Sequence, residues 1–175
     1  MLVRTLLLVL LLGATGPAVA GDRDRSRWGK GSSWDVHVDP DADNPCYAVR
    51  GFFGGTGILI AVRSDGGLAF AIARDVWQFA EAGKTYRLKF VFGNDATYEE
   101  ELEAVAIGSS VALWKSRMSA AFQSDFRAKT NLHVYHQGLL ISSVLLLDAD
   151  QAVAQLRTCN ASLPGMIDPT NPAFR

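Results

Sequence analysis

Three aspartates at alternate positions, Asp39, Asp41 and Asp43, are the strongest candidates for metal chemistry in this sequence. Carboxylates at every second residue suit the opening of a calcium-binding loop, which takes ligands from positions one, three and five. The rest of that loop is missing: Asn44 stands where the sharp turn needs glycine, and Arg50 where a bidentate glutamate is needed. We therefore predict an acidic turn without metal, with calcium binding as the alternative.

A second metal-like pattern is the pair His133 and His136. On a helix, two histidines at this spacing would share a face and could begin a zinc site. The segment 132–136 instead alternates as a β-strand does, and strand residues three apart point to opposite faces. We therefore expect no zinc site at this pair and no cofactor in the protein.

Cys46 and Cys159 are the two cysteines of the chain. They are too far apart for a C-x-x-C redox site, and in an exported protein paired thiols are oxidised to disulfides. We predict a structural disulfide between them. The alternative is two separate thiols.

Catalytic motifs are missing from the sequence. It has no G-x-S-x-G nucleophile motif, and the glycine-rich stretch 51–57 lacks the spacing of a phosphate-binding loop. The glutamates in 99–103 could offer the carboxylate pair of a glycosidase, but any two alternate strand residues meet that distance. We expect a non-enzymatic protein. A hydrolase would need His37, His133 or His136 beside a serine or a carboxylate.

Three aromatic residues, Trp77, Tyr86 and Trp114, are candidates for a ligand or partner surface. Aromatic side chains at strand spacing usually lie in a core. The alternative is that they line a cavity for an apolar or sugar-like ligand.

Residues 1–20 have the pattern of a cleavable secretory signal. Arg4 precedes an apolar run at 6–12, and the small residues Ala18 and Ala20 follow. This run is too short to cross a bilayer, so we expect no transmembrane anchor after cleavage. The predicted location is the periplasm or the extracellular space.

The exported chain divides into three parts. Residues 21–33 are charged and small, and we predict a flexible leader there. Residues 34–162 are expected to form a single β-rich domain closed by the disulfide, and 163–175 to form an irregular tail with three prolines. The net charge of −1 gives no electrostatic reason to expect binding to nucleic acid.

Alternation of apolar and polar residues predicts strands along most of the domain. The segment 96–107 reads as one long strand or two, because Glu100 falls among the apolar positions. The predicted strands are 34–39, 46–53, 57–63, 67–73, 84–92, 96–107, 111–114, 132–136 and 138–146.

Helical spacing appears twice. Met118, Phe122 and Phe126 recur every four residues and predict a helix within 116–126. Asp148 with Gln151 three residues later forms a capping box, predicting a helix of about eleven residues that carries Cys159. The strands up to 84–92 are expected to form an antiparallel meander. The fold class is therefore α+β and strand-dominated: one antiparallel sheet, flat or curled toward a barrel, with two packed helices, one of them C-terminal.

These features lead to an expected function. Export, a stabilising disulfide and missing catalytic motifs favour a non-enzymatic domain that binds another cell-envelope component, a protein, through a sheet edge or an aromatic patch. The alternative is a small-ligand-binding module with an aromatic-lined pocket near Trp77, Tyr86 and Trp114. The second alternative is a hydrolase without recognised motifs.

Overall fold

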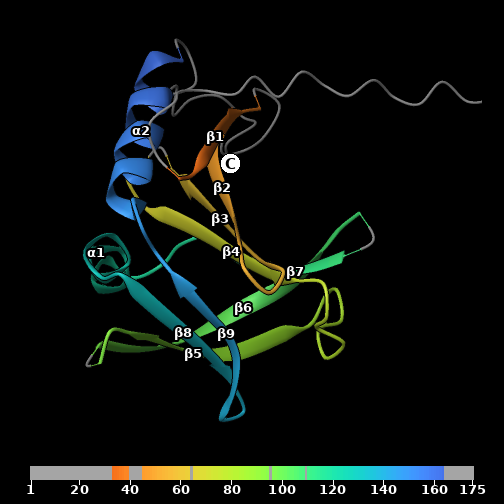
Figure 1. The fold of residues 1–175 in the computed structure, drawn as a ribbon. Helices are drawn as coiled ribbons and strands as arrows, with labels where there is room; N and C mark the ends of the chain where they lie inside the picture. Colours follow the sequence, from red (N-terminus) through yellow and green to blue (C-terminus); the bar gives the residue numbers. More distant parts are fainter. Residues whose placement is uncertain (1–32, 40–44, 64, 95, 109, 164–175) are drawn as a thin grey trace, which may run out of the picture.

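The computed structural model describes residues 33–39, 45–63, 65–94, 96–108 and 110–163 (Figure 1). The predicted signal peptide lies outside these ranges, as do the leader and the tail except for Ser33 and Leu163.

The described residues form nine strands and two helices, close to the predicted positions. The segment 96–107 is one strand, and the first helix begins at Ala120, later than predicted, because the Ser119 side chain accepts a hydrogen bond from the Phe122 amide and caps it. The strands are β1 (Asp35–Val38), β2 (Cys46–Phe52), β3 (Thr56–Val62), β4 (Leu68–Arg74), β5 (Thr85–Phe92), β6 (Ala96–Ile107), β7 (Ser110–Lys115), β8 (Asn131–His136) and β9 (Leu139–Leu145), and the helices are α1 (Ala120–Ala128) and α2 (Ala149–Ser162).

All nine strands belong to one antiparallel sheet in the order β1-β2-β3-β4-β7-β6-β5-β8-β9. The predicted meander of the first five strands is correct from β1 to β4 and wrong at β5, which does not pair with β4. The connection 75–84 carries the chain past two positions of the sheet, so β4 pairs with β7 and β5 pairs with β8. Alternation along one strand fixes which face is buried, but it does not choose the neighbouring strand.

The sheet is not closed, and β1 and β9 are its two edge strands. Its two ends nevertheless approach each other, with β9 crossing in front of the other strands in Figure 1. The buried hydroxyls of Thr56 on β3 and Ser142 on β9 are hydrogen-bonded at 3.0 Å. The sheet therefore curls without forming a barrel.

The concave side of this sheet is filled by aromatic side chains. Phe70 and Phe90 project from β4 and β5 and meet Phe122 of α1, with ring centroids 5.3–5.7 Å apart. Phe126, one turn later on α1, contacts Phe70 and Trp34. Burying rings of this size is the largest source of stability in such a core, because burial of apolar area contributes roughly 25 cal/mol per Å².

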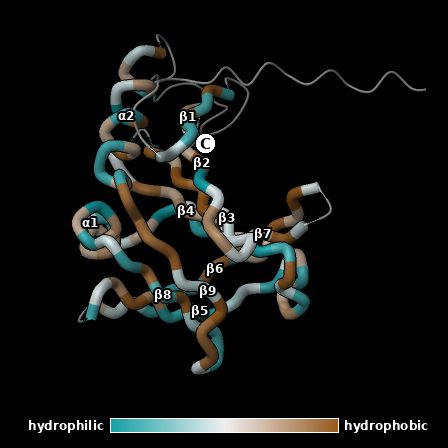
Figure 2. The backbone as a smooth tube through the Cα atoms, viewed as in Figure 1, coloured by the Kyte–Doolittle hydropathy of each residue, from teal (hydrophilic) through white to brown (hydrophobic). Residues whose placement is uncertain are grey.

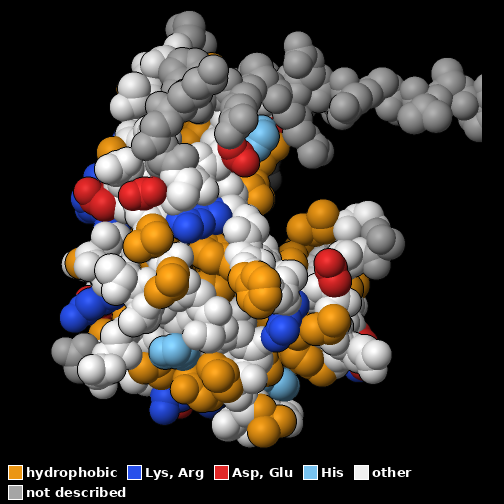
Figure 3. Space-filling model, in the orientation of Figure 1, with side chains coloured by type: hydrophobic (Ala, Val, Ile, Leu, Met, Phe, Trp, Pro, Cys, Tyr) orange, Lys and Arg blue, Asp and Glu red, His pale blue; other side chains and the backbone are white. Residues whose placement is uncertain are grey.

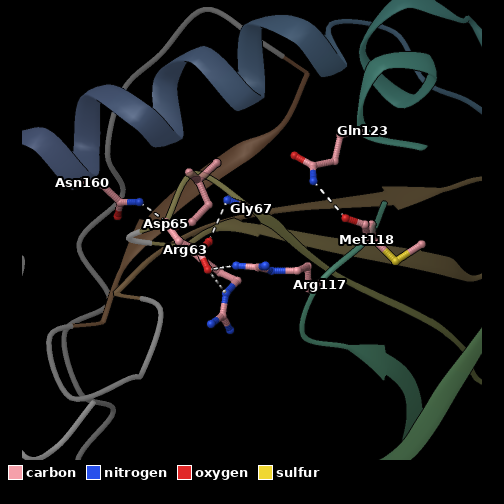
Figure 4. Close-up of polar contacts among 8 residues, drawn as sticks. Arg63, Asp65, Gly67, Arg117, Met118, Gln123 and Asn160 are labelled. Carbon is pink, nitrogen blue, oxygen red and sulfur yellow. Dashed lines mark hydrogen bonds and ion pairs between the residues drawn. The ribbon is translucent and has the colours of Figure 1, made fainter. Parts of the chain in front are cut away.

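Helix α2 packs against α1 and the first three strands. Its buried face includes Ala152, Leu156 and Cys159, and Cys159 is disulfide-bonded to Cys46 of β2 across 113 residues of sequence. The predicted disulfide is confirmed. The next residue, Asn160, donates from Nδ2 to the Val62 carbonyl oxygen at 2.6 Å, which fastens the same end of α2 to β3 (Figure 4).

The capping box predicted for α2 is wrong. Asp148 has φ of 62° and lies in the left-handed region, and its side chain makes no capping hydrogen bond. A capping side chain normally requires extended backbone at this position. The carboxylate instead accepts from the Ser33 amide at 3.3 Å, and the helix runs for 14 residues rather than about eleven.

The turn between β3 and β4 is held by Asp65 (Figure 4). One carboxylate oxygen accepts from the Gly67 amide at 2.9 Å, while the other contacts the guanidinium groups of Arg63 and Arg117. Arg117 lies in the segment between β7 and α1. Asp65 therefore links the β3–β4 hairpin to the segment that precedes α1.

Candidate functional site

The predicted calcium ligands are only partly within the described residues. Asp39 follows β1, and its amide donates to the Pro45 carbonyl at 2.7 Å. Asp41 and Asp43 lie outside the described ranges. Among the described residues, no group of three or more histidine, cysteine, aspartate or glutamate side chains could hold a metal ion.

The two histidines of β8 have separate surroundings. His136 stacks on Phe79 at 4.6 Å, and its Nδ1 lies 3.3 Å from the Arg87 carbonyl oxygen. His133 is three residues earlier on the same strand and points to the other face. Within the described part of the chain, no hydrogen bond joins a histidine ring to a serine hydroxyl or a carboxylate.

Of the three predicted aromatic site residues, two belong to one cluster. Phe79 lies between Trp77 and Tyr86, with centroids 5.5 and 5.6 Å away. The Tyr86 hydroxyl donates to the Phe79 carbonyl and accepts from the Glu81 amide, both at 2.9 Å, so the ring is held in place. Trp114 lies on β7 opposite Ala71 and Glu103, and no ring contact within the described ranges joins it to this cluster. The three residues do not form one site.

Tyr86 also borders an open groove of about 810 Å³ over β5 and β8. Arg87 and Lys89 contribute cations, and Tyr135 and His136 contribute rings. The hydrogen bond between Arg87 and Glu101, at 2.9 Å, raises the pKa of the guanidinium. The same bond holds the guanidinium beside Glu101. This groove could receive a polar ligand that stacks on an aromatic ring.

The most apolar exposed surface lies along the edge strand β9. Figure 2 shows β9 hydrophobic at both ends with a paler middle, and Figure 3 shows hydrophobic side chains gathered on the face that β9 crosses. Two other exposed large hydrophobic residues, Val76 and Ile107, lie elsewhere among the described residues. We call this surface the β9 patch; its members are Phe53, Leu139, Leu140, Leu145 and Leu147, which are 104, 71, 55, 56 and 48% exposed.

Sequence reasoning missed the β9 patch, although one signal was present. Apolar residues stand next to one another at 139–141 and 144–147, which breaks the alternation of a strand with one wet face. Some of these side chains must therefore point outward. Phe53 carried no such signal, because its exposure depends on the turn in which it lies.

A hollow of about 350 Å³ lies inside the patch, between the β2–β3 turn and β9. Phe53 and Leu140 border it, and the hydrogen-bonded hydroxyls of Thr56 and Ser142 line its buried side. Arg74 forms part of the wall. The site thus combines an apolar rim with a polar floor and one cation.

Two half-buried arginines reach the edge of β9 from the other end of the sheet. Arg74 donates from Nε to the Gly54 carbonyl and from Nη1 to the Ile141 carbonyl, each at 2.9 Å. Arg50 donates to the Leu147 carbonyl at 2.5 Å and lies over the Phe52 ring at 5.0 Å. Side chains therefore bridge the opening that strand pairing leaves between the sheet ends.

No family model matches this sequence, and no curated protein matches it. Among solved structures, the crystal structure of invasion associated protein B from Bartonella henselae is similar, with a TM-score of 0.62. The two chains are 11% identical, and the match covers 78% of this chain and 99% of that chain. At this identity the likeness shows the fold alone. No helix in the described ranges is long and apolar enough to cross a membrane.

Proposed function

We propose that this protein is an exported, non-enzymatic domain that binds another cell-envelope protein through the β9 patch. The observation that carries the proposal is the clustering of exposed side chains. Phe53 and four leucines on and just after β9 expose about half or more of their surface along one edge strand and the turn beside it. Large apolar side chains that are exposed together in one region mark interaction sites more often than singly scattered ones do.

A protein partner fits this surface better than a small molecule. The patch covers the two ends of β9 and an adjoining turn, and it is exposed rather than enclosed. Protein interfaces concentrate their binding energy in a few apolar anchors surrounded by a polar rim. Phe53 has the size and the exposure of such an anchor.

Three observations support export and a non-enzymatic role. The Cys46–Cys159 disulfide is typical of proteins that fold in an oxidising compartment, and residues 1–20 have the pattern of a secretory signal. Across the described residues, no histidine is paired with a nucleophile or a carboxylate. These observations favour a binding function.

Site-specific photo-crosslinking in the producing cell tests the proposal. A benzophenone side chain replaces Phe53 or Leu145 in the patch, and Ile107 serves as the matched exposed control at 55% exposure. We expect one discrete crosslinked protein from the two patch positions and none from Ile107. Equal crosslinking at all three positions, or none at any, would overturn the proposal.

The groove beside Tyr86 favours a second candidate function, the binding of a small polar ligand. Native mass spectrometry of the mature protein purified from its own host tests this candidate. A bound small molecule that is lost in Tyr135→Ala would support ligand binding. Protein free of any bound molecule, which gains none after incubation with the host envelope extract, would remove it.

A further inference from the structure

The arginines at the edge of β9 limit how a partner can dock. A peptide that adds a strand to a sheet must hydrogen-bond with the free backbone groups of the edge strand. Here the Ile141 carbonyl is already bonded to Arg74, and the Leu147 carbonyl accepts from Arg50, Trp34 and Ser33. Natural sheets protect their edges in this way against pairing with other chains.

The same arginines also leave positive charge at the patch. Arg50 and Arg74 donate to backbone carbonyls, and neither has a carboxylate within ion-pair distance among the residues that the structure describes. Asp75, next to Arg74 in sequence, is exposed and makes no ion pair among the described residues, and Asp148, which follows Leu147, accepts from the Ser33 amide. Half-buried cations that lack a counter-ion favour a partner that brings one.

We infer that the hollow of the β9 patch binds an apolar side chain of a partner segment that carries a carboxylate beside it, and that this segment docks through side chains rather than as an added strand. The inference rests on the proposed function. The hollow of about 350 Å³ is at the small end of the roughly 300–1,000 Å³ of ligand pockets, as expected for a site that takes one side chain. The carboxylate pairs with Arg74 on its wall.

A second copy of this chain fits the patch less well. A twofold contact would bring the same surface of both copies together. Arg50 and Arg74 of one copy would then face the same arginines of the other, and like charges across an interface oppose association. Charge therefore favours an acidic partner over self-association.

Short synthetic peptides with defined patterns test the inference on the mature protein. One peptide alternates leucine with aspartate, a second leucine with lysine, and a third serine with aspartate. We expect the leucine–aspartate peptide to bind at least about tenfold more tightly than the other two, and less tightly as salt rises. Backbone NMR shifts are expected at Gly54 and Leu140, with no new exchange protection of the β9 amides.

Two variants locate the binding. Phe53→Ser removes a fully exposed ring and is expected to weaken leucine–aspartate binding about tenfold, whereas Ile107→Ser leaves it unchanged. Replacing Arg74 would also remove two hydrogen bonds that stabilise the sheet, so the charge is tested at Arg50 instead. Arg50→Gln is expected to reduce the salt dependence of leucine–aspartate peptide binding.

The outcomes separate this inference from the proposed function. Equal binding of the aspartate and lysine peptides overturns the acidic partner, and new protection along β9 overturns side-chain docking. If the crosslink at Phe53 is still obtained with either result, the proposed function stands and this inference fails. Loss of the crosslink while the leucine–aspartate peptide still binds the hollow overturns the proposed function alone.

Discussion

Arg74 of β4 holds the carbonyl oxygen of Ile141 on β9 at 2.9 Å, although four strands separate β4 from β9 in the order of the sheet. The same guanidinium holds the Gly54 carbonyl at 2.9 Å. One side chain therefore joins the β2–β3 turn to the far edge strand. The curl of this sheet is fixed at that point by side-chain hydrogen bonds instead of strand pairing.

Replacing Arg74 with methionine is expected to lower the free energy of unfolding by about 1–2 kcal/mol, because two carbonyls lose their charged donor. Arg87→Met is the matched control. Arg87 makes an exposed cross-strand ion pair with Glu101, and its loss is expected to change the free energy of unfolding much less, because solvent screens such a pair. Urea denaturation of both variants measures the difference. Equal values would show that Arg74 does not fasten the sheet.

Much of the fold could be predicted from local sequence. In β5, alternation across Tyr86–Phe92 gave the buried face, and in α1 the spacing of Phe122 and Phe126 gave the face that meets the core. Strand order could not be predicted. The position of β7 between β4 and β6 depends on long-range pairing, which leaves no periodic trace in either segment.

The candidate site was harder to predict than the fold. Tyr86 lies in an aromatic cluster with Phe79, whereas Trp114 lies in a different region of the sheet. Leu140 and Leu145 look like core residues in sequence, but they pair with Tyr135 and Asn131 on the face of the sheet opposite the buried Ser142 and Val144. Exposure of such residues follows from topology, so it becomes visible only in the folded chain.

Breaking the Cys46–Cys159 disulfide is expected to destabilise the domain strongly. On the chain-entropy model, a link across 113 residues contributes at most about 4–5 kcal/mol, by restricting the unfolded chain. Cys46→Ala and reduction of the wild type should therefore lower the melting temperature by the same amount. Thermal melts with and without a reductant measure this, and Cys46→Ala/Cys159→Ala excludes effects of the remaining thiol. A reduced protein that melts like the oxidised one would contradict the prediction.

Glu100 seemed out of place among apolar residues because its partner is distant in sequence. Its carboxylate lies 2.5 Å from the Lys115 ammonium on β7, and the two side chains are only 13 and 29% exposed. Glu100→Gln leaves the partly buried ammonium without its counter-ion, which is expected to cost about 1–3 kcal/mol in the free energy of unfolding. Glu101→Gln, next in sequence but on the exposed face, should cost at most about 1 kcal/mol. If the two variants have the same denaturation midpoint, the inner ion pair does not stabilise the fold.

Tyr98 of β6 donates its hydroxyl proton to Asp125 of α1, and this hydrogen bond, followed by burial and the nearby negative charge, raises the pKa of the phenol from 10.0 to about 12. A raised pKa means that the folded state holds the proton more tightly than the unfolded state. The stabilisation is therefore complete below pH 10, declines as the unfolded chain loses its proton, and is gone above about pH 12. Denaturation of the wild type and Tyr98→Phe at a series of pH values should show a difference that shrinks across this range, and ultraviolet titration should show one tyrosinate transition near pH 12 that the variant lacks. If the difference stays constant up to pH 12, the phenolic proton does not link β6 to α1.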